Sequence, residues 1–390
     1  MKNNKTVLAV IVTFFCTLLL STAFFEANQT PPGMLQKAYQ IIKKNYYGDF
    51  DEEKLFEGAV AGMVAALEDP YSYYMSADSY AELQNDLNSE FTGIGATVTV
   101  DPADNLLTIV APIEGSPAEQ AGLKPNDKIL SINDMAVSGD NYQEAIKLMR
   151  GDESSIGENI KLLVRPTGQE ESVVYNITRA KIVNHTVNYK MLANDIGYIQ
   201  ITNFELKTDQ EFISAVEALG KDQLKGLVID LRYNPGGAFS STKEIADYLL
   251  PEGVITSFEF KDGSKQEYTS DADYYDVPLA VLINGSSASA SEVLSGALRD
   301  HDRAVLIGEK TYGKGIVQSI IPFDETKEGE TALYLTTSGY LTPNGDNIHH
   351  VGISPDIEVP TPEYLEGTNP TDIPQEEDIQ LQRAISELSK

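Results

Sequence analysis

The chain has 390 residues, of which 29 are basic and 59 acidic, so its formal net charge at pH 7 is −30. This length allows two or three domains, and the negative charge repels the phosphate backbone of nucleic acids. The single cysteine, Cys16, excludes an internal disulfide framework and a cysteine-ligated zinc site. We therefore expect a folded protein without a nucleic-acid partner.

An uncharged apolar run lies close to the N-terminus. Lys2 and Lys5 precede Val7–Phe25, whose length is at the boundary between a signal peptide and a spanning helix of roughly 20 residues. Both interpretations place the remainder of the chain outside the cytoplasm, because the lysines stay on the cytoplasmic side. We predict that residues 1–27 are a signal peptide or signal anchor and that the rest is extracytoplasmic, either anchored to the membrane or released after cleavage. A buried core helix is the alternative.

The remaining chain divides into four segments by its pattern. Residues 33–88 carry apolar residues at helical spacing and predict an N-terminal helical segment. Residues 89–179 contain short β-rich runs between turns, which predict a small β-domain. Residues 180–362 alternate apolar strands with helices, which indicates an α/β core whose strands are buried on both faces. Residues 363–390 form an acidic tail and a helix that we expect to pack on its own domain, with a homodimer contact as the alternative.

The individual elements follow from the same patterns. In the β-domain the expected strands are 96–100, 106–110, 128–132, 160–164 and 172–177. In the core the expected strands are 196–201, 227–231, 279–283 and 304–307, and the expected helices are 209–219 and 241–250, with a last helix at 376–388.

Two glycines precede the first strand of the β-domain, in Phe91-Thr-Gly-Ile-Gly-Ala96. Adjacent backbone N–H groups in such a loop can point at one anion, and we expect a peptide carboxylate. With Gly115-Ser-Pro-Ala118, Ala121-Gly-Leu123 and Asp127-Lys-Ile129 following in order, the segment resembles a PDZ domain of the bacterial protease type.

This resemblance implies a peptide-binding function for residues 89–179. PDZ domains add the C-terminus of a ligand as an extra strand and hold its carboxylate in the glycine loop. The residues implied to bind peptides with apolar C-termini are Gly93, Ile94, Gly95 and Ala96. A helix ending at Arg150 would line the groove. In similar proteins an arginine at this place can face the protease core, which makes Arg150 a candidate gating residue.

Three segments of the core carry polar residues where strands end, and open α/β sheets place their sites at such edges. Asp230-Leu-Arg-Tyr-Asn-Pro-Gly-Gly237 forces a tight turn with exposed N–H groups, which suits an oxyanion. Ile283-Asn-Gly-Ser-Ser-Ala-Ser-Ala-Ser-Glu-Val293 ends a strand in small hydroxyl residues and begins a helix. N-capping is the ordinary role of such serines. Gly308-Glu-Lys-Thr-Tyr-Gly-Lys-Gly-Ile-Val-Gln318 offers two lysines after a strand.

Other chemistries fit these segments less well. Gly308, Gly313 and Lys314 nearly form a phosphate-binding P-loop, but Gly315 stands where the magnesium-binding Ser/Thr belongs. Ser289 is not flanked by the glycines of a nucleophile elbow. The four histidines show neither metal spacing nor a place for a Ser/His/Asp triad. We therefore expect no metal and no cofactor.

Together with the β-domain, the three segments resemble the carboxyl-terminal processing proteases, which are tail-specific Ser/Lys peptidases. The resemblance covers roughly residues 35–388 and includes Glu68-Asp-Pro-Tyr-Ser72. It implies an α/β core of crotonase-like layered sheet and helices, with an inserted PDZ domain and flanking helical segments, in addition to the N-terminal membrane or signal helix. The helical segments would suit a homodimer, as in similar proteins.

The resemblance also implies the roles of individual residues. The middle serine, Ser289, would be the nucleophile and Lys314 the general base, held by Gln318. The N–H of Ala290, with that of Gly236 or Gly237, would form the oxyanion hole.

Such a base must be uncharged, which sets a physical condition. A lysine with the usual pKa of about 10.4 is protonated at pH 7, so burial away from acids must lower its pKa. Glu292 and Glu309 are the nearest acids in sequence, and we expect both carboxylates to point away from the Lys314 amine.

The leading interpretation is an exported serine endopeptidase that recognises protein substrates by their C-termini, with the PDZ domain tethering them or gating the site. A catalytically inactive PDZ scaffold on a hydrolase-like core is the alternative. A third interpretation is a non-proteolytic acyl-transfer enzyme, since the core resembles enoyl-hydratase-like folds.

Overall fold

The computed structural model describes residues 31–87, 90–113, 115–151, 153–326, 329–365 and 367–390. The chain divides into two compact units, residues 1–63 and 64–390. The predicted signal segment, residues 1–27, lies outside the described residues. Among the helices that are described, none is both long and apolar enough to cross a membrane.

The first unit contains α2 (Pro31–Asn45) and most of α3 (Glu52–Ala65). Side chains join the two helices: the Tyr39 hydroxyl and the Lys43 amine both donate to the Glu52 carboxylate, each over 2.6 Å. Both helices expected from the apolar spacing are therefore present.

The second unit begins with β1 (Tyr73–Met75) and α4 (Ala77–Leu87). An antiparallel sheet follows in the order β3-β4-β5-β7-β8, with β6 paired to β5. Its strands are β3 (Ala96–Asp101), β4 (Leu106–Pro112), β5 (Lys128–Ile132), β6 (Met135–Ala136), β7 (Asn159–Arg165) and β8 (Val173–Thr178). The five expected strands are all confirmed, with ends that differ by at most two residues.

Two helices, α5 (Pro117–Gln120) and α6 (Tyr142–Arg150), accompany this sheet. Alternate strand residues form its core, including Leu107, Ile129 and Leu162, which are fully buried. A separate two-stranded ladder pairs β2 (Glu90–Gly93) with β9 (Ala180–Val183). β3 lies at an edge of the sheet, so one side of its backbone is available to a further strand.

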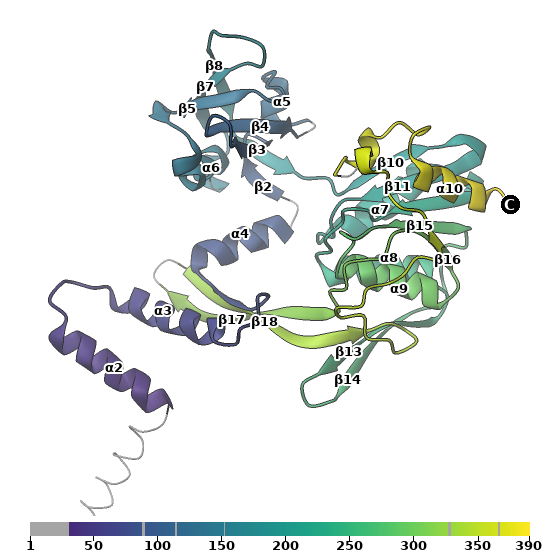
Figure 1. Cartoon of the computed structure of the whole chain (residues 1–390). Helices are drawn as coiled ribbons and strands as arrows, with labels where there is room; N and C mark the ends of the chain where they lie inside the picture. The colour runs from purple at the N-terminus through teal and green to yellow at the C-terminus, as the bar shows by residue number, and fades with distance from the viewer. Residues whose placement is uncertain (1–30, 88–89, 114, 152, 327–328, 366) are drawn as a thin grey trace, which may run out of the picture. The chain divides into compact units, whose positions relative to one another are not determined.

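A six-stranded sheet carries the α/β core (Figure 1), in the order β10-β11-β12-β15-β16-β19. The strands are β10 (Val187–Met191), β11 (Ile196–Ile201), β12 (Gly226–Asp230), β15 (Leu279–Ile283), β16 (Ala304–Gly308) and β19 (Ile357–Glu358). Only the β10–β11 pair is antiparallel. All residues of β11, β12 and β15 are buried, as expected for strands covered on both faces.

Helices cover this sheet on both sides. The helices α7 (Thr208–Ala218), α8 (Phe239–Leu249) and α9 (Ala290–Asp300) share a core cluster with Ile229, Val281 and alternate neighbours. On the other face, α10 (Ile379–Leu388) packs against β12, β15 and β16, and its Leu381 and Ala384 share a buried cluster with Tyr198. Leu381 and Ala384 of α10 are therefore buried on their own domain, as we expected, whereas Ile379 is exposed.

A second sheet was not anticipated from the sequence. It runs β1-β18-β13-β14, with β17 paired to β18 (Figure 1). Its longer strands are β13 (Gly253–Phe260), β14 (Lys265–Ser270), β17 (Ile316–Thr326) and β18 (Gly329–Leu341). Pro322 and two register shifts interrupt the alternation of β17, which hides its strand pattern.

Short 3-10 helices complete the described elements: η1 (Gly139–Asn141), η2 (Glu153–Ser155), η3 (Ala193–Asp195), η4 (Lys221–Gln223), η5 (Glu363–Leu365) and η6 (Pro370–Asp372).

Candidate active site

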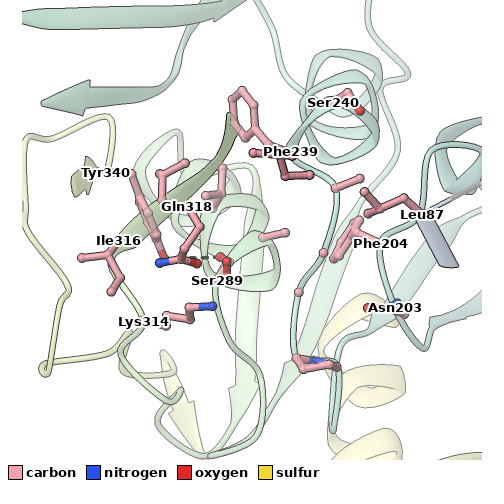
Figure 2. Close-up of a pocket in the computed structure, with 18 of the residues that line it drawn as sticks. Leu87, Asn203, Phe204, Phe239, Ser240, Ser289, Lys314, Ile316, Gln318 and Tyr340 are labelled. Carbon is pink, nitrogen blue, oxygen red and sulfur yellow. Dashed lines mark hydrogen bonds between the residues drawn. The ribbon is translucent and has the colours of Figure 1, made fainter. Parts of the chain in front are cut away.

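The loops after β12, β15 and β16 meet in one cavity of about 510 Å³ (Figure 2). These strands are neighbours and parallel, so their carboxyl ends lie at one edge of the sheet. The predicted residues that line the cavity are Gly236, Gly237, Ser289, Ala290, Lys314 and Gln318. Segments more than 70 residues apart in the chain thus contribute to a single site.

Ser289 occupies the junction between the loop after β15 and helix α9. Its backbone has φ 54° and ψ −113°, a conformation that costs a non-glycine residue about 1–3 kcal/mol. The Ser289 N–H donates to Glu292 Oε2 over 2.9 Å, and its carbonyl accepts from the Tyr340 hydroxyl over 3.3 Å. Ser289 therefore sits in a strained strand-to-helix turn, although the flanking glycines of a nucleophile elbow are missing.

The neighbouring serines have structural roles. Ser287 Oγ donates to the Leu231 carbonyl over 2.8 Å, and Ser291 Oγ donates to the Asn234 carbonyl over 2.9 Å; both serines are fully buried. In the part of the chain that is described, the Ser289 hydroxyl donates to no carbonyl. Among these three serines, only Ser289 lines the cavity.

The Asn-Pro-Gly-Gly turn distinguishes between the two candidate oxyanion donors after β12. The Gly236 N–H already donates to Asn234 Oδ1 over 2.9 Å. The N–H groups of Gly237 and Ala290 have no acceptor among the described residues. Gly237 and Ala290 are therefore the pair free to receive an oxyanion.

Both glycines of the turn are required by its geometry. Gly236 has φ 104° and Gly237 has φ 135°, which side chains rarely adopt. A Cβ on Gly236 would lie 2.8 Å from Ser289 Cβ, and a Cβ on Gly237 would lie 2.0 Å from the Phe204 carbonyl oxygen. The absence of a side chain thus lets the backbone approach Ser289 at Gly236 and Phe204 at Gly237.

Lys314 extends into the cavity, with its nitrogen toward the side where Ser289 lies (Figure 2). The side chain is half-buried, and its amine lies 4.9 Å from the centre of the Tyr71 ring. Burial lowers the pKa of Lys314, while the charges of Asp69 and Glu292 act in the opposite direction. The net direction is the one that a general base requires.

Glu292 is fully buried in the first turn of α9, and its carboxylate receives four hydrogen bonds. The donors are Ser289 N, Thr311 Oγ1, Gly313 N and Lys314 N, at 2.6–2.9 Å. Glu309 instead accepts from the Thr361 hydroxyl over 2.8 Å. Across the described ranges, neither carboxylate forms an ion pair with the Lys314 amine, as we expected.

Gln318 lines the same cavity from β17. Its amide nitrogen donates to Thr336 Oγ1 over 3.3 Å. No hydrogen bond joins Gln318 to Lys314 in the described structure, so its role in holding the base stays a prediction.

The rest of the cavity wall is mostly apolar, with Asn203 and Ser240 as its polar side chains. It includes Phe204, Phe239, Phe258, Val293 and Tyr340, of which Phe204 and Tyr340 are almost fully buried. Such a wall excludes water from the Lys314 amine and suits an apolar side chain of a substrate.

The predicted peptide groove lies between β3 and α6. Its lining includes Gly93, Ile94, Gly95 and Ala96 on one side and Tyr142, Ile146, Met149 and Arg150 on the other. The N–H groups of Ile94 and Gly95 have no acceptor within the described residues, whereas their carbonyls accept from Ala118 and Ile113. The loop therefore presents two donors at the start of an edge strand. The Arg150 guanidinium lies over the Phe91 ring at 5.4 Å.

Sequence reasoning missed two residues that lie close to Lys314, namely Asp69 and Tyr71. They belong to the Glu68–Ser72 motif, which the family resemblance included without a role. It also missed Tyr340, whose strand was not predicted. The signal for Asp69 and Tyr71 was present in the sequence as this motif. The position of Tyr340 depends on the long β17–β18 hairpin.

Three family models match the chain. The model described as peptidase family S41 matches residues 195–359. A PDZ domain model matches residues 108–165, and the model of the activating protease CtpB N-terminal domain matches residues 26–79. Together these matches span the helical segment, the β-domain and the core.

Two curated relatives are similar over most of their length. The carboxy-terminal processing protease CtpA of Bacillus subtilis (strain 168) is 38% identical over 332 residues, covering 85% of this chain and 69% of that protein. The carboxy-terminal processing protease CtpB of the same organism is 36% identical over 336 residues, with coverages of 85% and 68%.

Solved structures give the same fold. The photosystem II D1 C-terminal processing protease is 26% identical with a TM-score of 0.51, covering 88% of this chain and 92% of that one. An S41 protease from Bacteroides fragilis reaches a TM-score of 0.54 at 19% identity, with coverages of 88% and 91%, a likeness in fold alone.

Proposed function

The chain belongs to the carboxy-terminal processing proteases of peptidase family S41, and we propose that it is an exported serine endopeptidase with Ser289 as nucleophile and Lys314 as base. One observation carries the proposal. A strained serine, a half-buried lysine with a lowered pKa and two unengaged N–H groups line one largely apolar cavity.

The first half of the reaction forms an acyl-enzyme. The neutral Lys314 amine takes the Ser289 hydroxyl proton as the oxygen attacks the scissile carbonyl carbon. The N–H groups of Gly237 and Ala290 stabilise the oxyanion, a contribution of about 10²–10³ in rate for each donor. When the C–N bond breaks, the Lys314 ammonium returns the proton to the leaving amine.

Water completes the reaction. Lys314 takes a proton from a water molecule that attacks the ester carbon, and the proton then passes to Ser289 Oγ as the C–O bond breaks. The products are a new carboxylate, the released C-terminal peptide and the original dyad, so protons balance over the cycle. Gln318 is a candidate to orient Lys314 during these transfers.

Substrate selection belongs to the groove between β3 and α6. A substrate C-terminus would add as a strand to β3, with its carboxylate on the N–H groups of Ile94 and Gly95. The apolar side chains of Ile146 and Met149 favour apolar C-termini. The groove either tethers substrates or gates the site, and Arg150 at the end of α6 is the candidate residue for gating.

Cleavage of an unstructured protein with an apolar C-terminus tests the assignment. Ser289→Ala and Lys314→Ala should each abolish cleavage, and Lys314→Arg should do so as well, since a guanidinium is not deprotonated in proteins. Wild-type activity in either alanine variant would reject the dyad. An inactive scaffold would instead bind the peptide without cleaving it in the unaltered chain.

Export is proposed from Val7–Phe25. Protease added to intact cells that lack an outer barrier should digest the core of the protein. Protection of the core until the cells are lysed would contradict export.

A further inference from the structure

The Glu68–Ser72 motif forms a turn beside the proposed base, between α3 and β1. The Tyr71 N–H donates to Asp69 Oδ1 over 3.0 Å, and the Ser72 hydroxyl donates to Asp69 Oδ2 over 2.5 Å. Both oxygens of Asp69 are therefore used to hold the turn that carries Tyr71.

The turn is also attached to the sheet that lines the cavity. The Thr336 N–H donates to Ser72 Oγ over 2.9 Å, and β1 pairs with residues 332–334 of β18. The hydroxyl of the same Thr336 accepts a hydrogen bond from the Gln318 side-chain amide. Tyr71 is thus fixed in position from its own turn and from β18.

The Tyr71 ring covers the Lys314 amine, with 4.9 Å between the nitrogen and the ring centre. Tyr312, which comes from the loop of Lys314 itself, is the first cause of the raised pKa of the Tyr71 hydroxyl. The turn and the base loop therefore meet where the Tyr71 ring faces the Lys314 amine.

We propose that Tyr71 is a positioning residue for the base, whose ring excludes water from the Lys314 amine while Asp69 and Ser72 hold that ring in place. The proposal rests on the proposed function only in naming Lys314 as the base. The cover itself is a property of the resting protein.

Two opposing effects of the ring decide the direction of its influence. An aromatic face attracts an ammonium, which would favour the charged form. Exclusion of water favours the neutral form, and burial is the largest influence on the pKa of Lys314, which is lowered. The charged groups that face the amine, Asp69 and Glu292, raise that pKa, and His349 acts on Asp69. Loss of the cover should therefore raise the pKa of Lys314.

Direct titration of Lys314 tests the proposal without depending on activity. Ser289→Ala protein labelled with [13Cε]lysine is titrated by NMR, and the Lys314 signal is assigned by its loss in Lys314→Arg. Tyr71→Ala and Tyr71→Gln, which admit water, should raise the pKa by about one unit or more, a tenfold loss of neutral amine. Tyr71→Phe and Tyr71→Leu, which keep an apolar cover, should titrate within a few tenths of a unit of wild type.

Tyr74→Ala is the matched control. This tyrosine is three residues further on, and its ring packs edge-on against Phe323, not against Lys314. It should leave the titration unchanged. If Tyr71→Ala does not fold, Tyr71→Gln carries the test.

The same variants give a readout in the active enzyme. In Tyr71→Gln, the acid limb of kcat/KM against pH should move to higher pH by the same amount, and activity should recover at high pH. A merely structural defect would lower the whole profile without moving the limb.

The proposal is overturned if Tyr71→Gln titrates like wild type, or if Tyr71→Phe shifts as far as Tyr71→Gln. These outcomes are distinct from failure of the dyad, because the titration can be measured whether or not Lys314 proves to be the base.

Discussion

Glu292 Oε2 accepts a hydrogen bond from the backbone N–H of Lys314 over 2.8 Å, although the same carboxylate forms no ion pair with the Lys314 amine within the described residues. Backbone donors on both sides, Ser289 N and Gly313 N, share this buried carboxylate. Glu292 therefore joins the loop that carries Lys314 to the turn that carries Ser289. Its negative charge is stabilised by backbone and hydroxyl donors and not by the Lys314 amine.

We predict that Glu292→Gln lowers both stability and kcat. An amide can accept at one oxygen only, so at least one of the four donors would face an NH₂ group, and a charge-assisted bond is worth about 1.5–3 kcal/mol. Urea unfolding should show a loss of that size, and kcat should fall at least tenfold while KM changes little. Glu309→Gln, which loses only a bond from Thr361, is the control and should stay close to wild type in both measurements.

Lys314→Met should stabilise the fold while abolishing activity. The lowered pKa of Lys314 means that the folded state disfavours the charged amine. Between this pKa and the usual 10.5 the unfolded chain binds more protons, so wild-type stability rises with pH there. The advantage of Lys314→Met should be greatest below that window and shrink as the pH rises through it. Unfolding curves at several pH values measure this difference.

The exposed Lys310, four residues earlier, serves as the control for this measurement. Lys310→Met should change stability by no more than about 0.5 kcal/mol at any pH. If Lys314→Met destabilises the protein at neutral pH, the proposal that burial dominates at this lysine is wrong.

The sequence predicted the parts of this site that depend on local pattern. Apolar runs identified β11, β12, β15 and β16, and turn-forming residues after three of them located the segments that meet in the cavity. Neighbouring parallel strands bring their carboxyl ends together. The three motifs therefore needed no long-range information beyond the order of the strands.

What the sequence left open depends on which groups bond inside the folded turns and on contacts between distant segments. Asn234 Oδ1 already engages the Gly236 N–H, and only the folded turn reveals that Gly237 is the free donor. The strained φ of Ser289 arises without flanking glycines, because Glu292, three residues later, accepts from its N–H and the distant Tyr340 donates to its carbonyl. Local spacing does not report the contact with Tyr340.

Gly237→Ala should remove activity and destabilise the fold. The added Cβ would lie 2.0 Å from the Phe204 carbonyl oxygen, so the turn must move and take the N–H of residue 237 with it. We expect kcat to fall by about 10² or more, as for loss of an oxyanion donor. Gly263→Ala is the control: φ is also positive (81°), but nothing lies within 4 Å, so only about 1–2 kcal/mol of strain is expected and activity should persist. Equal activity in the two variants would exclude Gly237 as a donor.

Asp378→Ala should be strongly destabilising. Its carboxylate accepts from Arg232 Nη1 and Nη2 over 3.0 and 2.8 Å, and it also caps α10 through the Leu381 N–H. Arg232 and Asp378 are almost fully buried; removal of one partner from such a pair costs up to about 3–5 kcal/mol, and less here because Arg232 keeps its bonds to Asp230. Lys225→Ala breaks the exposed pair with Asp195 and should cost less than about 1 kcal/mol. Similar losses in both variants, measured by chemical unfolding, would contradict the role of the buried cluster.

Gly95→Ala should abolish capture of peptide C-termini. Gly95 has φ 74°, and a Cβ would lie 2.4 Å from Ser116 Cβ, so the loop cannot keep its two N–H groups directed at one carboxylate. Fluorescence anisotropy in the Ser289→Ala background measures binding of a labelled peptide with an apolar C-terminus. We expect at least tenfold weaker binding for Gly95→Ala, and a similar loss when the peptide is amidated, because the loop N–H groups require a carboxylate.

The β7–β8 turn supplies the matched control within the same sheet. Gly168 has a comparable φ of 76°, but nothing lies within 4 Å of the added Cβ. Gly168→Ala should therefore bind the peptide as tightly as the unaltered groove, even if it lowers stability by about 1–2 kcal/mol. If the amidated peptide binds as tightly as the free acid, the glycine loop does not bind the C-terminal carboxylate of the peptide. In that case, substrate selection must depend on side-chain contacts along β3 and α6 alone.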